Sequence, residues 1–274
     1  MPVLPPSYLN AVVAIGSTEK NCIASGFLYS YLVPGQEKIE EGKKKVQPYL
    51  VTNRHVFEGL DKVFVRLNPQ DGKPAKSFSL RLNDKFLAYS HPNPEIDVAV
   101  VPTKGYWLEG LGMQYYYFKD NVDVAFKKQL SDFAVSEGQS VYTLGFPLGL
   151  VSERDFVIVR HGTLARIRDA LSGFGHEYLV DTFVFPGNSG GPVVIKPETV
   201  SISEKSVPFP YLIGIVAGYL PYREEAISRQ TGNPRVIFEE NSGLASVIPI
   251  DYVQECVIQN YIEAEKRGLT KDMK

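Results

Sequence analysis

The sequence predicts an all-β protein in two similar halves that ends in a helix. Short β-branched and aromatic runs recur between turn residues, and they fall into two series. The first series lies at 10–17, 25–33, 49–53, 62–67 and 97–102, and the second at 140–147, 155–167, 177–185, 191–195, 211–220 and 243–250. Short strands at this spacing are typical of antiparallel meanders, not of strands joined by crossover helices.

The segment between the two series, residues 104–133, has neither strand nor helix periodicity and is long for a simple connection. We expect a linker there, with one helical turn. The predicted division is an N-terminal domain at 1–118, a linker at 119–133, a C-terminal domain at 134–250, and a helix with tail at 251–274. Two charged stretches, 34–48 and 221–235, are expected to be solvent-exposed loops, the second with room for a short helix.

The C-terminal segment, residues 250–269, predicts the helix. Four apolar side chains recur at helical spacing and form one face: Val253, Val257, Ile258 and Tyr261. Asp251 is expected to cap the start of this helix, and Gly268 lies near its expected end. We therefore expect a helix that docks its apolar face on a barrel.

The composition limits the classes of protein to which this chain can belong. The chain has 274 residues, 44% of them hydrophobic, and a net charge of -2, so it can bury a core and has no electrostatic reason to bind nucleic acid or an anionic membrane. No apolar run approaches the ~18 residues that span a bilayer. The start of the chain lacks the basic residues of a secretory signal.

The two cysteines, Cys22 and Cys256, are too few for a disulfide framework and are typical of a reducing compartment. We expect two buried thiols, with one disulfide between them as the alternative. Together with the composition, this predicts a cytoplasmic protein without a nucleic-acid or membrane partner. The sequence does not indicate its oligomeric state.

Three short motifs contain candidate catalytic residues. His55 lies in YLVTNRHVFEG, where a predicted strand runs into a turn; Asp97 precedes the apolar run VAVV; and Ser189 lies in PGNSGGPVV. Taken singly, each has a plain structural interpretation as an edge histidine, a strand-end carboxylate and a turn serine. Taken together, in this order and in these contexts, they favour a catalytic interpretation.

These motifs resemble those of the chymotrypsin-fold serine proteases, most closely the bacterial trypsin-like and HtrA/Deg branch. The pattern T-x-x-H-V is matched at 52–56, D-[IV]-A-[VL] at 97–100 and G-N-S-G-G-P at 187–192. Weaker agreement extends over about residues 10–255. The resemblance implies two six-stranded antiparallel Greek-key barrels with the C-terminal helix appended, and we expect no PDZ domain.

The resemblance also implies a mechanism of peptide-bond hydrolysis. Ser189 is the expected nucleophile, His55 the general base, and Asp97 the carboxylate that orients the imidazole. The amides of Gly187 and Ser189 are expected to form the oxyanion hole. A peptide or protein substrate follows, and no metal or organic cofactor is required.

Asn188 distinguishes this chain from the digestive enzymes. Those enzymes carry an aspartate directly before the serine, where it pairs with an amino terminus released by cleavage. Here the position holds an asparagine, as in the HtrA branch. We therefore expect the oxyanion loop to form without N-terminal processing.

Substrate specificity follows from the resemblance as an expectation of an apolar primary pocket. Phe183, six residues before the serine, corresponds to the pocket floor, and no charge lies there. The residues expected to bind substrate are Phe183, Val184, Phe185, Val216, Ala217, Gly218, Tyr219 and Gly243. The backbone of 216–219 would pair with an extended substrate.

Two other functions remain open from the sequence. One is a catalytically silent, protease-like module that binds peptides, although the intact motifs argue against it. The other is a regulatory protease that a partner activates by remodelling the oxyanion loop. The remaining histidines, His91, His161 and His176, lack neighbours at metal-ligand spacing, and we interpret them as structural.

Overall fold

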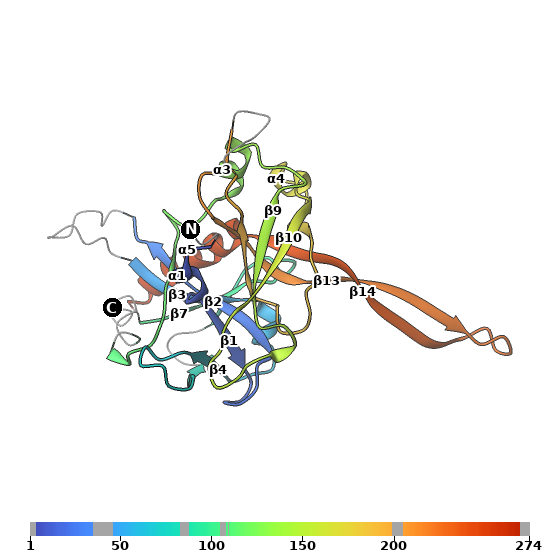
Figure 1. Ribbon diagram of the computed structural model, residues 1–274, viewed down its shortest axis with the longest axis horizontal. Coiled ribbons are helices and arrows are strands. Elements are labelled where there is room, and N and C mark those ends of the chain that lie inside the picture. Colours follow the sequence, from blue (N-terminus) through green and yellow to red (C-terminus); the bar gives the residue numbers. More distant parts are fainter. Residues whose placement is uncertain are drawn as a thin grey trace.

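The computed structural model describes residues 4–34, 46–82, 88–104, 108, 110–198 and 205–268. In this part of the chain two β-sheets form two barrel-like halves, and the C-terminal helix packs against strands of both (Figure 1). The all-β prediction with two halves and a terminal helix is confirmed. The charged stretch 34–48 falls mostly outside the described residues.

In the residues that the structure describes, the N-terminal half has eight strands, and a short helix precedes the first of them. Its elements are α1 (Pro6–Leu9), β1 (Val12–Gly16), β2 (Ala24–Leu32), β3 (Val46–Thr52), β4 (Lys62–Leu67), β5 (Lys76–Arg81), β6 (Tyr89–Ser90), β7 (Ala99–Pro102) and β8 (Phe118–Lys119). The strand order is β5-β4-β1-β2-β3-β7-β6, and β8 pairs in parallel with β2 while the other pairs are antiparallel. The described strands thus number eight, where six were expected, because the short strands β6 and β8 add to the sheet.

The C-terminal half is a closed six-stranded barrel, as predicted. Its strands are β9 (Ser140–Gly145), β10 (Ile158–Arg166), β11 (Tyr178–Asp181), β12 (Pro192–Ile195), β13 (Leu212–Ile227) and β14 (Pro234–Pro249), joined in the order β10-β11-β14-β13-β12-β9. Of two short helices, α3 (Lys127–Asp132) precedes β9 and α4 (Arg168–Leu171) connects β10 to β11. Helix α3 is the helical turn that the sequence predicts between the halves.

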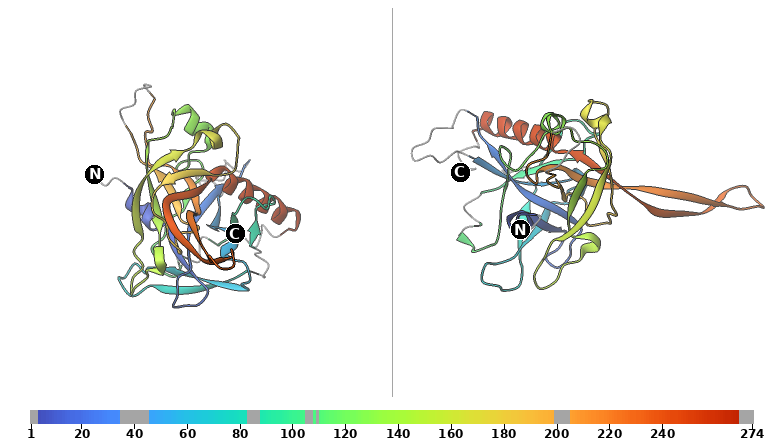
Figure 2. Two further views of the ribbon diagram at one scale, coloured as in Figure 1. Left: turned by 90° about the vertical axis from the view of Figure 1, so that its right-hand side faces the viewer. Right: turned by 45° about the horizontal axis from the view of Figure 1, so that its top comes forward.

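The expected loop at 221–235 is instead a β-hairpin, and that prediction is wrong. Strands β13 and β14 continue past the barrel and pair with each other as far as Ile227 and Pro234. Figures 1 and 2 show the hairpin extending well beyond the rest of the molecule. The charged residues suggested a loop, but Tyr222 and the run 236–238 favour extended structure, and Gly232, with a φ of 70°, permits the turn.

The core consists of three apolar clusters. One fills the N-terminal barrel, one fills the C-terminal barrel, and the third lies between the halves and includes Phe27, Leu144 and Phe146. Helix α5 (Ile250–Lys266) completes the third cluster with Val253 and Val257, which are fully buried. The functional motifs lie where the two halves meet, so this shared layer fixes their relative positions.

The ends of α5 bear out one expectation and correct another. Gly268, with a φ of 72°, follows the last helical residues, as predicted. Asp251 does not cap the helix. It lies in the first turn, and its carboxylate accepts the amide of Lys127 at 3.1 and 3.3 Å, so it joins α5 to the start of α3.

Both cysteines are free thiols, Cys256 buried and Cys22 partly buried, so the alternative of a disulfide is not realised. Burial raises the pKa of Cys22 to about 11, which keeps it protonated at neutral pH. Within the described part of the chain, none of the helices is both long and apolar enough to cross a membrane.

Candidate active site

His55 lies in a single 3-10 turn, Arg54–Val56, directly after strand β3. Asn53, which precedes this turn, is fully buried, and its side-chain amide donates to the Asp97 backbone carbonyl at 2.8 Å. This bond ties the end of β3 to the segment that leads into β7 (Ala99–Pro102). The buried strand end therefore holds the backbone of His55 beside that of Asp97.

The Asp97 carboxylate contacts His55 twice. One oxygen, Oδ1, accepts the backbone amide of His55 at 3.0 Å, and the other, Oδ2, lies 2.5 Å from Nδ1 of the imidazole. Burial opposes ionisation of Asp97, but the hydrogen bonds from His55 outweigh it and lower the pKa of the carboxyl. An ionised carboxylate only accepts hydrogen bonds, so the proton lies on Nδ1 and leaves Nε2 as a base.

The same hydrogen bond changes the basicity of the histidine. It raises the pKa of His55 above 6.5, with burial working in the opposite direction and the Asp97 charge adding to the rise. The His55 side chain is 46% exposed and that of Asp97 is 22% exposed. The imidazole is thus oriented from one side and open to the cleft on the other.

The Ser189 loop connects β11 to β12 and depends on two glycines with positive φ. Gly187 has a φ of 99° and Gly190 a φ of 84°, values that disfavour any residue with a Cβ. Space excludes a Cβ as well, because it would overlap the Phe146 carbonyl oxygen at Gly187 and the Ser25 carbonyl oxygen at Gly190. The loop therefore lies directly against the backbone of both halves.

Ser25 of strand β2 clamps this loop from the N-terminal half. Its hydroxyl donates to the Gly187 carbonyl at 2.6 Å and accepts the Phe146 amide at 2.9 Å, while its own amide donates to the Ser189 carbonyl at 2.9 Å. Ser25 is fully buried. These bonds turn the carbonyls of Gly187 and Ser189 away from the cleft.

The peptide before Gly187 is oriented in the same way. The Pro186 carbonyl accepts the Leu148 amide at 2.6 Å, so this oxygen is also occupied. Among the described residues, the amides of Gly187 and Ser189 have no hydrogen-bond acceptor. The loop thus offers two uncommitted amide donors on either side of Asn188, while its carbonyls are held elsewhere.

Asn188 stabilises the loop without any charged partner. It is 1% exposed, and its side-chain oxygen accepts the Phe185 amide at 3.0 Å. Its backbone amide donates back to the Phe185 carbonyl at 2.9 Å. A neutral asparagine that is satisfied within four residues of its own segment needs no amino terminus to balance it.

A cleft of about 520 Å³ lies at the junction of the two halves, and both His55 and Ser189 line it. The Ser189 hydroxyl donates to the Ala217 carbonyl at 3.3 Å, and within the described residues it makes no hydrogen bond to His55. Catalytic hydrogen bonds are often loose in a protein without substrate. Rotation about the Cα–Cβ bond of Ser189 would turn this hydroxyl toward another acceptor.

The expected specificity residues separate into two groups. Val184, Phe185, Val216, Gly218 and Tyr219 line the cleft together with His55 and Ser189. Phe183, Ala217 and Gly243 do not line it. The Phe183 ring is half exposed and lies within about 3.5 to 3.7 Å of where a Cβ on Gly243 would be. Phe183 stacks on Phe185 with the ring centroids 6.5 Å apart, so it supports the cleft from outside.

The cleft also contains residues that the sequence did not indicate. Arg223 and Glu239, from the base of the projecting hairpin, line it and form an ion pair at 2.9 Å. The Tyr219 hydroxyl donates to the same carboxylate at 3.0 Å. Because the segment 221–235 was expected to be a loop, only the strand pairing reveals that these charges belong to the cleft.

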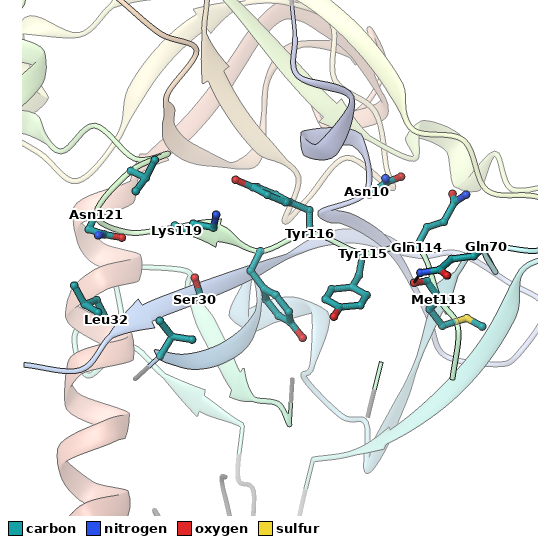
Figure 3. Close-up of a pocket in the computed structure, with 13 residues that line it drawn as sticks. Asn10, Ser30, Leu32, Gln70, Met113, Gln114, Tyr115, Tyr116, Lys119 and Asn121 are labelled. Atoms are coloured by element: carbon teal, nitrogen blue, oxygen red, sulfur yellow. Dashed lines mark hydrogen bonds between the residues drawn. The ribbon is translucent and has the colours of Figure 1, made fainter. Parts of the chain in front are cut away.

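A second cavity, of about 840 Å³, lies on the N-terminal half and contains none of the predicted site residues (Figure 3). Amide and tyrosine side chains line much of it, including Asn10, Gln70, Gln114 and Tyr116. The Tyr116 hydroxyl donates to Asp123 at 2.8 Å. This cavity is larger than the cleft, and neither His55 nor Ser189 lines it.

The chain matches the family described as trypsin-like peptidase domain over residues 24–198. The chain therefore belongs to the trypsin-like peptidases and has the chymotrypsin fold, which confirms the resemblance drawn from its motifs. The family match places it among the proteases, a class of hydrolase.

Solved structures with a similar fold include three proteases at low sequence identity. The apo MamO protease domain from Magnetospirillum magneticum is 17% identical with a TM-score of 0.48, and the match covers 91% of this chain and 97% of that one. HtrA-type protease AlgW with tripeptide is 21% identical with a TM-score of 0.49, covering 94% and 62%. The inactive form of a mutant Rv3671c from M. tuberculosis H37Rv is 15% identical with a TM-score of 0.41, covering 96% and 97%. No curated protein sequence matches the chain.

Proposed function

We propose that this protein is a serine endopeptidase that hydrolyses peptide bonds through an acyl-enzyme on Ser189. The observation that carries the proposal is the 2.5 Å contact between His55 Nδ1 and Asp97 Oδ2 beside a cleft that His55 shares with Ser189. A structural histidine would not need a carboxylate at one ring nitrogen and an open cleft at the other. The substrate is a peptide or protein segment in extended conformation.

In the proposed reaction, His55 Nε2 takes the proton of the Ser189 hydroxyl as its oxygen attacks the substrate carbonyl. The carbonyl double bond opens to an oxyanion, which the Gly187 and Ser189 amides stabilise. The imidazolium then gives its proton to the leaving amine as the peptide C–N bond breaks. Water, activated by the same histidine, releases the acyl group and restores Ser189.

Asp97 contributes by holding the imidazole and by stabilising its positive charge. Its hydrogen bond to Nδ1 fixes the tautomer in which Nε2 carries the lone pair. The fold supports this role, because Asp97 is itself held by the buried amide of Asn53. The N-terminal half therefore orients the base, and the C-terminal half supplies the nucleophile.

We further propose that the enzyme needs neither N-terminal cleavage nor a partner to form its oxyanion hole. Asn188 is satisfied by Phe185, and the carbonyls of Pro186 and Gly187 are bound by Leu148 and Ser25. In an inactive loop, one of these two carbonyls would instead point into the oxyanion site. These bonds therefore favour a protease that is active on its own over one that a partner must activate.

The primary pocket is proposed to accept an apolar side chain. Val184, Val216 and the Phe185 ring contribute apolar surface to the cleft, and its charges are confined to the paired Arg223 and Glu239. A peptide library that varies the residue before the scissile bond tests this preference. Cleavage that follows acidic or basic residues would contradict it.

The experiment for the function itself is peptide hydrolysis by the purified chain. Ser189→Ala and His55→Ala are each expected to lower kcat by roughly 10⁶-fold, as in triads that act as a unit. The matched control is His161→Ala, which removes a histidine of strand β10 outside the cleft. Peptide binding without turnover in the unmutated chain would favour a silent binding module, and turnover only with an added factor would favour a regulated protease.

A further inference from the structure

The projecting hairpin has an unpaired edge along strand β14. Strand β14 pairs with β11 only from Leu244 to Val247, whereas it pairs with β13 from Pro234 onward. Within the described residues, the stretch 234–241 therefore has a neighbouring strand on one side only. An exposed edge of this kind presents unpaired amides and carbonyls and is a template for another strand.

The two edges of the hairpin are protected to different degrees. The β13 edge carries Pro221 and the consecutive charges of 223–225, which are the usual means of preventing strand addition. The β14 edge has Pro234, Arg235 and two glutamates at its ends, but between them it carries the run Val236, Ile237 and Phe238, which are 49%, 60% and 56% exposed. Three consecutive large apolar residues on a solvent-exposed edge are costly unless another surface covers them.

The register of the hairpin assigns these side chains to faces. Val236 lies opposite Ala226 and Phe238 opposite Glu224, so Val236 and Phe238 share one face. Ile237 lies opposite Glu225 on the other face. Apolar residues thus occur on both faces of the same edge, and a strand added alongside β14 would contact all three.

We propose that this edge pairs with the same edge of a second copy of the chain, antiparallel and with the two-fold axis at Ile237. In that register Val236 lies opposite Phe238 of the second copy, an aromatic and β-branched pair that favours strand association. Arg235 lies opposite Glu239 of the second copy, which already pairs with Arg223 of its own hairpin, so a second cation meets this carboxylate on either side of the axis. The two hairpins then form one four-stranded sheet.

In this register the segment 235–239 is complementary to the same segment of the second copy, whereas in the neighbouring register it is not. Moving the axis by one residue, to Phe238, places Val236 opposite Glu240 and Ile237 opposite Glu239 of the second copy, so apolar side chains then face carboxylates. A strand from an unrelated protein would have to supply the same pattern of one cation, three apolar residues and one anion. Self-complementarity therefore identifies a second copy as the occupant.

The paired edge is short, so we expect a weak dimer. Interfaces that bury less than about 1,200 Å² are characteristic of transient association. Dimerisation is thus to be measured at roughly 10 to 100 μM protein, by light scattering coupled to size exclusion and by sedimentation velocity. The inference does not depend on catalysis, because the mass of the particle is the readout.

Ile237→Cys is the sharpest test, because the proposed axis places this residue opposite itself. Directly opposed strand residues have Cα atoms about 4.5 to 5.5 Å apart, which suits a disulfide. We expect rapid oxidation of the variant to a covalent dimer. Glu225→Cys, at the position opposite Ile237 on the protected edge, is the matched control and is expected to stay monomeric under the same oxidation.

Ile237→Lys provides the complementary test, because it sets two ammonium groups against each other at the axis. It is expected to weaken dimerisation by at least about tenfold. A monomeric parent chain at about 100 μM, a dimer that survives Ile237→Lys, or equal crosslinking of Glu225→Cys and Ile237→Cys would each overturn the proposal. If the lysine variant fails to fold, the cysteine pair decides alone.

Discussion

Replacing Asp97 by asparagine tests the His55–Asp97 pair directly. The carboxylate accepts two hydrogen bonds, from the His55 amide at 3.0 Å and from Nδ1 at 2.5 Å. An asparagine has one acceptor oxygen, so its NH₂ group must face one of these donors or force Nδ1 to become an acceptor. If Nδ1 becomes the acceptor, the proton moves to Nε2, and the imidazole can no longer take a proton from Ser189.

The size of the change in His55 basicity follows from the lost bond. A hydrogen bond to a charged group contributes about 1.5–3 kcal/mol, and the 46% exposure of the His55 side chain favours the lower end. Loss of this bond should therefore lower the pKa of His55 toward 6.5, because the hydrogen bond to Asp97 is the main cause of its rise. Loss of the productive tautomer should lower kcat by about 10⁴-fold as well.

The assay is an NMR titration of the His55 ring protons in both proteins, together with kcat/KM against pH. Because His55 must be neutral to act as base, and hydrogen bonding to Asp97 raises its pKa, activity of the parent chain should fall as pH drops through a midpoint above 6.5. Asp97→Asn should move the titration midpoint down. Asp181→Asn, an exposed change of equal charge on β11, should leave it unchanged. An unchanged midpoint in Asp97→Asn would refute the proposed coupling.

Three further changes probe the oxyanion loop. Ser25→Ala leaves the Gly187 carbonyl and the Phe146 amide without the hydroxyl that both bind. We therefore expect the free energy of unfolding, measured by urea denaturation, to fall by about 1–3 kcal/mol, and kcat to fall as well. Unaltered stability would mean that the Ser25 hydrogen bonds do not stabilise the loop. Gly187→Ala forces a Cβ into the Phe146 carbonyl and should cost about 10²- to 10³-fold in kcat, as loss of one oxyanion donor does; full activity would argue against Gly187 as that donor. Asn188→Ala removes the acceptor of the Phe185 amide and should reduce activity more than it reduces secondary structure by circular dichroism, and the reverse pattern would count against its role in the loop.

Much of the fold could be predicted because its causes are local. Alternating β-branched runs between turn residues indicated the strands of both halves, and the spacing of Val253, Val257 and Tyr261 indicated α5, since strand and helix faces repeat at fixed intervals. The projecting hairpin could not be predicted in this way. Its charges resemble those of a loop, and its strand character comes from pairing between residues 221–227 and 234–241, which only the folded chain brings together.

The three predicted site residues lie in short sequence motifs, whereas the residues that hold them in place do not. His55, Asp97 and Ser189 lie in motifs of a few residues each, and the structure brings His55 to Asp97 and both His55 and Ser189 to one cleft. The clamp by Ser25 depends on an approach between residues far apart in the chain. Nothing in the run SGFLYS distinguishes Ser25, because the role of a buried hydroxyl depends on the groups that surround it.

Labelling of the intact chain with a fluorophosphonate probe tests the central claim most directly. The probe reacts only with a serine that is activated by a base and flanked by oxyanion donors, and it requires no knowledge of the substrate. The account predicts one phosphonyl adduct, located at Ser189 by mass spectrometry, on protein that retains Met1 and has met no partner. It also predicts no adduct on Ser189→Ala. A folded, unmutated chain that remains unlabelled would contradict a preformed catalytic site.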